Sequence, residues 1–168
     1  MHYLSRLEAG HQSPACGFDL DGVLTHTDEA ILRGAHERGL LVGRTPADIW
    51  TYYWEHAFPG EISNAQMMEI LNVPGFYRHL NPCEFMLDAI RHADREGFRV
   101  HLVTARRGPT HVQSDTRAWL EQHRVPHSHL AYREARDKAA YAVEHGLRFF
   151  VEDRFDTANE VAEHCPVL

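Results

Sequence analysis

The stretch Phe18-Asp19-Leu20-Asp21-Gly22-Val23-Leu24-Thr25 decides the fold of this chain. Its two carboxylates stand two positions apart, after the short apolar run Ala15–Phe18 and before a glycine. Side chains alternate along a strand, so Asp19 and Asp21 would point the same way unless the chain turns between them. Two like charges this close are costly unless a hard cation or a shared proton lies between them, and Gly22 lets the backbone turn away from the strand end. The alternative is an Asp-rich turn that closes an ordinary strand, because short motifs also match by chance.

Length and charge narrow the range of functions. A chain of 168 residues predicts about one domain with a substantial hydrophobic core. Its formal net charge is −7 and it has no cationic block, so binding of duplex nucleic acid through a broad basic face is not expected. Met1–Pro14 lacks the apolar region of a secretory signal, and no run is long enough to span a membrane. We therefore expect a cytoplasmic protein that does not enter the membrane.

The cysteines and histidines do not form a metal-binding pattern. The three cysteines are scattered, without CxxC or Cys/His finger spacing, so neither a disulfide framework nor a structural zinc site is expected. His123, His127 and His129 lie close together, but their spacing fits no zinc motif, and Pro126 between them predicts a loop. We interpret these three histidines as solvated loop residues.

Residues 26–80 show helical patterns and no convincing strand. Three helices are expected there: one capped by Thr27 or Asp28 and ending near Gly39, one opened by Thr45-Pro46 and running through Phe58, and one capped by Ser63 and running to Asn72. We predict a small all-helical insertion over this segment, after the first strand. The polar, aperiodic residues 1–13 are expected to form a loose arm.

From Pro82 onward, helical and strand-like segments alternate. The expected strands are Phe98–Val103, His129–Tyr132 and Leu147–Val151, in addition to Ala15–Phe18. The expected helices run from Pro82 to Gly97, from Pro109 to His123, from Asp137 to His145, and over a last segment with Phe155 and Ala162. This alternation predicts parallel βαβ units with right-handed crossovers. The fold class is therefore α/β with a Rossmann-like parallel sheet: residues 1–25 and 81–168 form the core, and residues 26–80 form the helical insertion.

Three groups of polar residues fall at predicted strand ends: Asp19 and Asp21, Thr104 and Arg106, and Glu152 and Asp153. Ligands of open parallel sheets bind at the carboxyl ends of the strands. We therefore expect the three groups to converge on one edge of the sheet and to form a single site.

The order of these motifs resembles the haloacid dehalogenase-like (HAD) superfamily. The first stretch is similar to that family's DxDGxL motif, and His101–Arg106 is similar to its second motif, a hydrophobic strand that ends in Thr or Ser. Lys138, at the start of a helix, stands where the family has its third motif. Phe149–Asp153 is similar to the fourth motif, an apolar strand that ends in two acids.

Within this superfamily, the chain resembles the 5'(3')-deoxyribonucleotidase-like group. Leu32-Arg33-Gly34 and Pro74-Gly75-Phe76-Tyr77 are similar to segments of that group, as are Trp119–His123 and Glu152-Asp153-Arg154. The second motif departs from the group, which usually has Thr-Ser where this chain has Thr104-Ala105. The resemblance implies a nucleoside monophosphate or another small phosphorylated metabolite as the substrate.

The resemblance further implies a phosphomonoester hydrolase that works through an aspartyl-phosphate intermediate. Asp19 would be the nucleophile, and Asp21 would be the general acid and then the general base. The metal would be Mg²⁺, held by Asp19, the backbone carbonyl of Asp21, and Asp153, with Glu152 acting through a metal-bound water. Asp156 would be either an outer member of this metal site or an ordinary acid in the first turn of a helix.

Other residues would contact the phosphate and the rest of the substrate, again by resemblance. Thr104 would donate its hydroxyl and Ala105 its backbone N–H to the transferring phosphoryl group, while Lys138 would pair with Asp19 and the phosphate oxygens. Arg106 would either bind a second part of the substrate or cover the rim of the site. The helical insertion would be a cap that closes over the substrate.

Trp50 and Trp54 are candidate substrate-binding residues of this cap, through stacking on a base or contact with an apolar leaving group. Alternatively, the aromatic residues of the segment form the cap's own core. Other functions remain open: a phosphatase for a phosphosugar or a biosynthetic intermediate, a phosphotransferase, and a non-catalytic HAD-like binding module. A costly cluster of charges argues against the binding module, because a protein without chemistry has no need of it.

Overall fold

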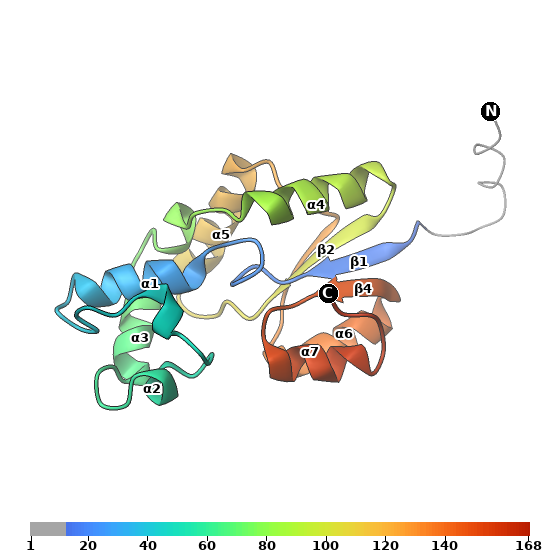
Figure 1. Cartoon of the computed structure of the whole chain (residues 1–168). Coiled ribbons are helices and arrows are strands. Elements are labelled where there is room, and N and C mark those ends of the chain that lie inside the picture. Colours follow the sequence, from blue (N-terminus) through green and yellow to red (C-terminus); the bar gives the residue numbers. More distant parts are fainter. Residues whose placement is uncertain (1–12) are drawn as a thin grey trace, which may run out of the picture.

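The computed structural model describes residues 13–168, and within them a four-stranded parallel sheet forms the centre of the fold (Figure 1). Its strands are β1 (Ala15–Phe18), β2 (Arg99–Thr104), β3 (His129–Tyr132) and β4 (Leu147–Val151). They lie in the order β3-β2-β1-β4. Parallel strands need crossover connections, and each connection here contains a helix. The predicted α/β class with a Rossmann-like parallel sheet is confirmed, and the strands lie within one residue of their predicted bounds.

The central strand, β1, is fully buried because it lies between β2 and β4. Its side chains alternate between two hydrophobic layers, with Cys16 and Phe18 in one and Ala15 in the other. Gly17 leaves room for Phe150 of β4, since a ring carbon of Phe150 lies 2.4 Å from the position that a Cβ on Gly17 would take. Small residues in β1 therefore allow close packing between the central strand and its neighbour.

Helices cover both faces of the sheet (Figure 1). They are α4 (Glu84–Arg95), α5 (Thr110–Gln122), α6 (Lys138–Glu144) and α7 (Phe155–Ala162), with a 3-10 turn at Ala135–Asp137 before α6. On one face, Leu87 of α4 and Trp119 of α5 pack in a cluster with Phe18. On the other face, Tyr141 of α6 and Val161 of α7 belong to a second cluster. The two clusters make the three-layer arrangement of helices, sheet and helices.

The segment between β1 and α4 contains α1 (Thr27–His36), α2 (Trp54–Ala57), α3 (Asn64–Leu71) and 3-10 turns at Pro46–Asp48 and Tyr77–His79. These helices lie beyond the end of the sheet toward which β1 runs (Figure 1), and Ile31, Trp54 and Phe58 belong to a hydrophobic cluster of their own. Ser63 caps α3 as predicted. The N–H of Gln66 donates to Ser63 Oγ at 3.3 Å, and the N–H of Ser63 donates to Gln66 Oε1 at 2.9 Å.

The predicted helix from Thr45 to Phe58 is wrong. Only one 3-10 turn and the short α2 are helical there, and Ile49 between them is extended, with φ −86° and ψ 100°. Thr45 precedes the turn, and the carboxylate of Asp48 accepts hydrogen bonds from its N–H (2.8 Å) and its hydroxyl (2.9 Å). The helix stops there because the β-branched and aromatic side chains of residues 49–53 have weak helix propensity and instead line a cavity.

The structure bears only in part on the expectations for residues 1–14 and for a membrane-spanning segment. The loose arm expected over residues 1–13 lies, except for its last residue, outside the described residues, as does most of Met1–Pro14. Within residues 13–168, no helix combines the length and the apolar character that crossing a membrane requires. Val167 forms a parallel bridge with Phe150, so the last described residues run along the outer edge of β4.

The three neighbouring histidines lie in different surroundings. The interpretation of His129 as a loop residue is wrong: it opens β3 in register with His101 of β2, and the two rings stack with centroids 4.2 Å apart. His123 ends α5 and packs on Trp119, with ring centroids 4.5 Å apart. His127 lies in the connecting loop and is exposed, as expected.

His101 makes the stability of the fold depend on pH. It is fully buried, it shares a hydrogen bond with Tyr141 through Nδ1 (2.9 Å), and among the described residues its Nε2 has no partner. Burial, with smaller effects of His129 and His145, lowers the pKa of His101 to about 4. Between this value and the pKa of about 6.5 of an unfolded histidine, the unfolded chain binds one more proton. Neutral His101 therefore contributes fully to the free energy of unfolding above about pH 6.5. This contribution is lost as the pH falls from about 6.5 toward 4.

We expect the free energy of unfolding to drop by about 1 kcal/mol more in the wild type than in His101→Phe when the pH is lowered from about 7.5 to about 5. Urea unfolding followed by circular dichroism at both pH values measures this difference. The same pH dependence in both proteins would show that His101 does not titrate in this window.

Candidate active site

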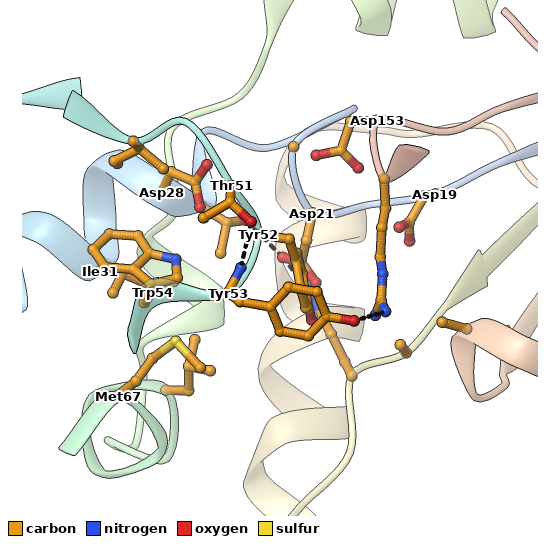
Figure 2. Close-up of a pocket in the computed structure, with 18 of the residues that line it drawn as sticks. Asp19, Asp21, Asp28, Ile31, Thr51, Tyr52, Tyr53, Trp54, Met67 and Asp153 are labelled. Carbon is orange, nitrogen blue, oxygen red and sulfur yellow. Dashed lines mark hydrogen bonds and ion pairs between the residues drawn. The ribbon is translucent and has the colours of Figure 1, made fainter. Parts of the chain in front are cut away.

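The ends of β1, β2 and β4 meet at one edge of the sheet, beside the helical segment (Figure 2). Asp19 directly follows β1, Ala105 follows β2, and Glu152 and Asp153 follow β4. Lys138 reaches the same place from the first residue of α6. All five line one cavity of about 630 Å³. The structure thus brings together residues that the sequence placed at separate strand and helix ends.

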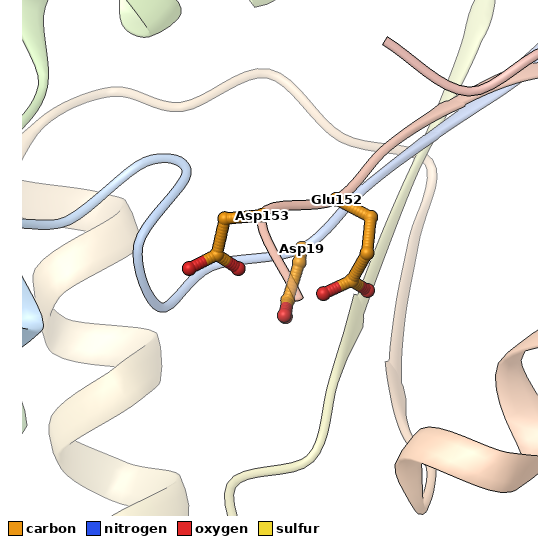
Figure 3. Close-up of side chains that lie close together, drawn as sticks. All are labelled: Asp19, Glu152 and Asp153. Carbon is orange, nitrogen blue, oxygen red and sulfur yellow. The ribbon is translucent and has the colours of Figure 1, made fainter. Parts of the chain in front are cut away.

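Three carboxylates lie close together in this cavity (Figure 3). Oxygens of Asp19, Glu152 and Asp153 lie within 4.8 Å of one another. Burial, with the charges of Glu152 and Asp21, raises the pKa of Asp19 to about 7, although Lys138 acts in the opposite direction. Burial and the charge of Asp19 raise the pKa of Asp153 to about 6. A donor set of carboxylate oxygens that repel one another fits a hard divalent cation, which would remove this repulsion.

Gly22 allows the loop after β1 to lie close to Asp153, which follows β4. It has φ +74°, and a Cβ at this position would lie 1.8 Å from Oδ2 of Asp153. A larger residue would therefore be strained in its backbone and would displace the Asp153 carboxylate. The turn predicted at Gly22 is present, and it is also what brings Asp153 next to the loop after β1.

Lys138 neutralises two of the carboxylates. Its Nζ lies 2.6 Å from Oδ2 of Asp19 and 2.7 Å from Oε2 of Glu152, and the side chain is only 2% exposed. Burial works to lower the pKa of Lys138, but the two carboxylates outweigh it and raise the pKa above its ordinary value. Lys138 is therefore a permanent cation. The sequence placed it beside Asp19 by resemblance, and its contact with Glu152 was not predicted.

Asp21 forms an ion pair with Arg106, whose side chain is buried, whereas that of Asp21 is 31% exposed. Both oxygens of Asp21 lie within 3.2 Å of Nε of Arg106, and Oδ1 lies 2.9 Å from Nη2. Oδ1 also accepts a hydrogen bond from the hydroxyl of Thr27 at 2.6 Å. Burial works to raise the pKa of Asp21, but Arg106 and Thr27 outweigh it and hold the pKa below its ordinary value. The sequence contained no signal for this pair, because it depends on the path of two loops.

Thr104 and Ala105 lie at the end of β2. Ala105 is exposed and lines the cavity, whereas Thr104 is fully buried behind it. The hydroxyl of Thr104 accepts a hydrogen bond from the N–H of Arg106 at 3.2 Å. Thr104 therefore shapes the loop that carries Ala105 and Arg106.

The wall opposite the clustered carboxylates is mostly apolar, although Asp28 also lies on that side (Figure 2). Figure 2 shows Ile31, Trp54 and Met67 on the side of the cavity away from Asp19. Trp54 is 3% exposed, and most of its ring packs in the cluster of the helical segment, 5.7 Å from Phe58 between ring centroids. The two tryptophans thus differ, because Trp50 also lines the cavity but is 72% exposed. Trp54 supports the wall and Trp50 lies at its rim.

Arg154 links the two sides of the cavity and was not singled out from the sequence. Its guanidinium lies 3.1 Å from the hydroxyl of Tyr53 and 4.3 Å from the ring centroid of Tyr52, both in the helical segment. It also contacts both oxygens of Asp156 at 2.5 Å. Asp156 is thus bound to Arg154, and the three clustered carboxylates do not include it.

Known proteins resemble this chain in structure only. No protein-family model matches it, and no curated protein matches its sequence. Among solved structures, 88 chains match. A HAD-superfamily hydrolase of subfamily IA from Geobacter sulfurreducens matches 93% of this chain and 88% of its own, with a TM-score of 0.58 and 18% identity. The chain has the fold of the HAD-superfamily hydrolases.

Two further matches extend this comparison. The class C acid phosphatase from Bacillus anthracis, solved with tungstate bound, matches 84% of this chain and 52% of its own, with a TM-score of 0.50 and 15% identity. A chain of the Pnkp1/Rnl/Hen1 RNA repair complex matches 98% of this chain, with a TM-score of 0.55 and 18% identity, and this chain spans 45% of its length. Identities this low establish the shared fold alone.

Proposed function

We propose that this protein is a metal-dependent phosphomonoester hydrolase in which Asp19 attacks phosphorus and forms an aspartyl-phosphate. The observation that carries the proposal is the buried contact between Lys138 and Asp19 at 2.6 Å, beside Glu152 and Asp153. Such a cluster of buried charges costs folding free energy, and charge clusters of this kind are typical of sites that carry out chemistry. The fold shared with HAD-superfamily hydrolases, a phosphatase among the structural matches, supports the same reaction type.

Mg²⁺ is the cofactor that we propose. Asp19, Asp153 and the backbone carbonyl of Asp21 would hold it, with Glu152 acting through a water. When bound, Mg²⁺ supplies the positive charge that lets a phosphate approach these carboxylates. The clustering of Asp19, Glu152 and Asp153 supports this assignment.

The reaction proceeds in two steps. In the first, a carboxylate oxygen of Asp19 bonds to phosphorus, the bond from phosphorus to the ester oxygen breaks, and Asp21 gives that oxygen a proton. Arg106 keeps Asp21 ionised in the free site, so Asp21 would take up this proton when the anionic phosphate binds beside it and raises its pKa. In the second, a water oxygen bonds to phosphorus and gives a proton to Asp21, the bond to Asp19 breaks, and inorganic phosphate leaves. Lys138 and the Ala105 N–H would stabilise the charge on the phosphoryl oxygens. The hydroxyl of Thr104, for which the same role was expected, is buried behind Ala105 and does not line the cavity, so Thr104 would instead hold the loop that carries Ala105.

The charges of the cavity favour a substrate with a single phosphate. Each cationic residue that lines it already pairs with a carboxylate: Lys138 with Asp19 and Glu152, Arg106 with Asp21, Arg107 with Glu134, and Arg154 with Asp156. One phosphoryl group would bind at the carboxylate cluster, and the apolar wall would contact the rest of the substrate.

We propose a nucleoside monophosphate or another small phosphorylated metabolite, with a phosphosugar or a biosynthetic intermediate as the alternative. Residues 26–80 would act as the cap over this substrate, and Trp50 at the rim is the aromatic residue that can contact the leaving group, with Trp54 behind it. A cap of this kind excludes water from the phosphoryl transfer.

A panel of phosphomonoesters tests the function. We expect release of inorganic phosphate from at least one nucleotide, deoxynucleotide or phosphosugar, with loss to background when EDTA removes divalent cations and recovery when Mg²⁺ is added. A short RNA with a terminal phosphate belongs in the panel because of the RNA repair match. Release that survives EDTA would contradict the metal requirement. A folded protein that binds Mg²⁺ but hydrolyses none of these esters would instead support the binding module.

A further inference from the structure

We propose that Arg106 is a positioning residue, which holds the carboxylate of Asp21 in the orientation that proton exchange with the ester oxygen and with water requires. This inference rests on the proposed function of Asp21. It gives Arg106 a part in catalysis without contact with the substrate. This role differs from both options that the sequence left open for Arg106, namely binding a second part of the substrate and covering the rim of the site.

The contacts of Arg106 fix its guanidinium on every side. The side chain has no exposed surface, and its Nε lies 3.0 and 3.2 Å from the two oxygens of Asp21. Nη2 lies 3.2 Å from the hydroxyl of Thr25, and Nη1 lies 3.2 Å from the hydroxyl of Thr116. One face of the group lies 4.5 Å from the ring centroid of Tyr77. Arg106 thus borders the cavity, but its side chain is paired with Asp21 and has no surface exposed to solvent.

Asp21 is held from two directions. Thr27, the first residue of α1, donates its hydroxyl to Oδ1 at 2.6 Å, and Arg106 reaches the same oxygen from the loop after β2. Among the described residues, Oδ2 receives a hydrogen bond only from Nε of Arg106, at 3.0 Å. The side chain of Asp21 is 31% exposed and lines the cavity. Oδ2 is therefore the oxygen that is free to carry the proton that passes to the ester oxygen and is later taken from water.

A forked guanidinium is suited to this task. Asp21 lies in the turn after β1, so the orientation of its carboxylate depends on its side-chain partners. Two parallel N–H donors fix both the position and the plane of a carboxylate, which a single ammonium group does not. A catalytic group that shifts by about 1 Å loses about 100-fold in rate. Arg106→Lys, which keeps the charge and loses the fork, should therefore misplace the proton donor.

The test compares two esters that differ in their need for a proton. The leaving oxygen of p-nitrophenyl phosphate needs little protonation, whereas that of β-glycerol phosphate needs a general acid. In Arg106→Lys we expect kcat to fall about 100-fold on β-glycerol phosphate but about 10-fold at most on p-nitrophenyl phosphate, with KM within about 3-fold on both. Arg107→Gln, the matched control, removes a neighbouring guanidinium that pairs with Glu134 and should change both esters by the same factor.

Other results would overturn the inference. Equal losses of kcat on the two esters would make Arg106 a structural residue, and a raised KM on both would make it a substrate ligand. Thr116→Val covers the case in which Arg106→Lys fails to fold: it removes one support of the guanidinium, and we expect a loss of about 3-fold on β-glycerol phosphate alone. Absence of Asp19-dependent turnover in the wild type would overturn the proposed function together with this role, whereas Asp19-dependent turnover with equal losses would overturn this role alone.

Discussion

Asp19→Asn should lower kcat for phosphate release by about 10⁴-fold or more, because an amide cannot form the bond to phosphorus on which the first step depends. Asparagine keeps the volume of the side chain, and Lys138 retains its second partner, Glu152, at 2.7 Å. The variant should therefore fold, and the loss should come from chemistry. Initial rates with saturating substrate and Mg²⁺ measure it, with circular dichroism as the check on folding.

Asp94→Asn is the matched control for this variant. Asp94 lies on the exposed surface of α4, outside the cavity, so Asp94→Asn makes the same replacement of a carboxylate by an amide away from the site. Its kcat should stay within about 2-fold of the wild type, since surface substitutions far from a site have small effects. If Asp19→Asn kept kcat within about 10-fold, some other group would have to attack phosphorus, and the aspartyl-phosphate mechanism would be wrong.

Lys138→Met should lower the free energy of unfolding by about 3–5 kcal/mol, because it leaves two buried carboxylates without their shared cation. The Nζ of Lys138 lies 2.6 Å from Asp19 and 2.7 Å from Glu152, and both carboxylates are nearly inaccessible to water. Methionine has a similar length and no charge. Urea unfolding in EDTA at about pH 8 measures this loss.

The double variant Lys138→Met/Glu152→Gln separates charge from packing. It removes one of the two uncompensated charges, so it should recover about 1–2 kcal/mol of the loss seen in Lys138→Met. If the double variant were no more stable than the single one, the loss would come from the packing of the lysine chain. A loss below about 1 kcal/mol in Lys138→Met would contradict the buried ion pair itself.

The strands could be predicted because their signals are local. Ala15–Phe18 and Leu147–Val151 are short apolar runs, the second bounded by Gly146 and Glu152, and the alternation with helices fixed their parallel arrangement. The segment before Phe58 could not be predicted in the same way. Aromatic residues at helical spacing also arise where a loop lines a cavity, and periodicity alone does not distinguish the two cases.

The same distinction applies to the site: features that follow from local sequence and sheet topology could be predicted, and contacts between distant loops could not. The carboxylates at strand ends were predictable, since parallel topology brings the ends of β1 and β4 to one edge. The ion pair of Asp21 and Arg106 joins residues 85 positions apart, which lie in two different loops. The sequence of neither loop indicates that the other lies beside it. One signal was overlooked: Lys138 is the only lysine in the sequence, which uses arginine at every other such cationic position. A position that specifically requires an ammonium group is a reasonable candidate for a buried or catalytic one.

The place of β1 in the centre of the sheet also affects how a newly made chain folds. Ala15 pairs with Arg99 on one side and with Leu147 on the other, so its second neighbour is synthesised 132 residues later. At ribosomal rates of about 5–20 residues per second, this strand stays unpaired on that side for on the order of 10 s. Throughout that time an apolar strand edge is open to other chains. Slow translation or crowded ribosomes should therefore promote aggregation through β1, and chaperones that bind extended apolar segments should increase the yield of folded protein.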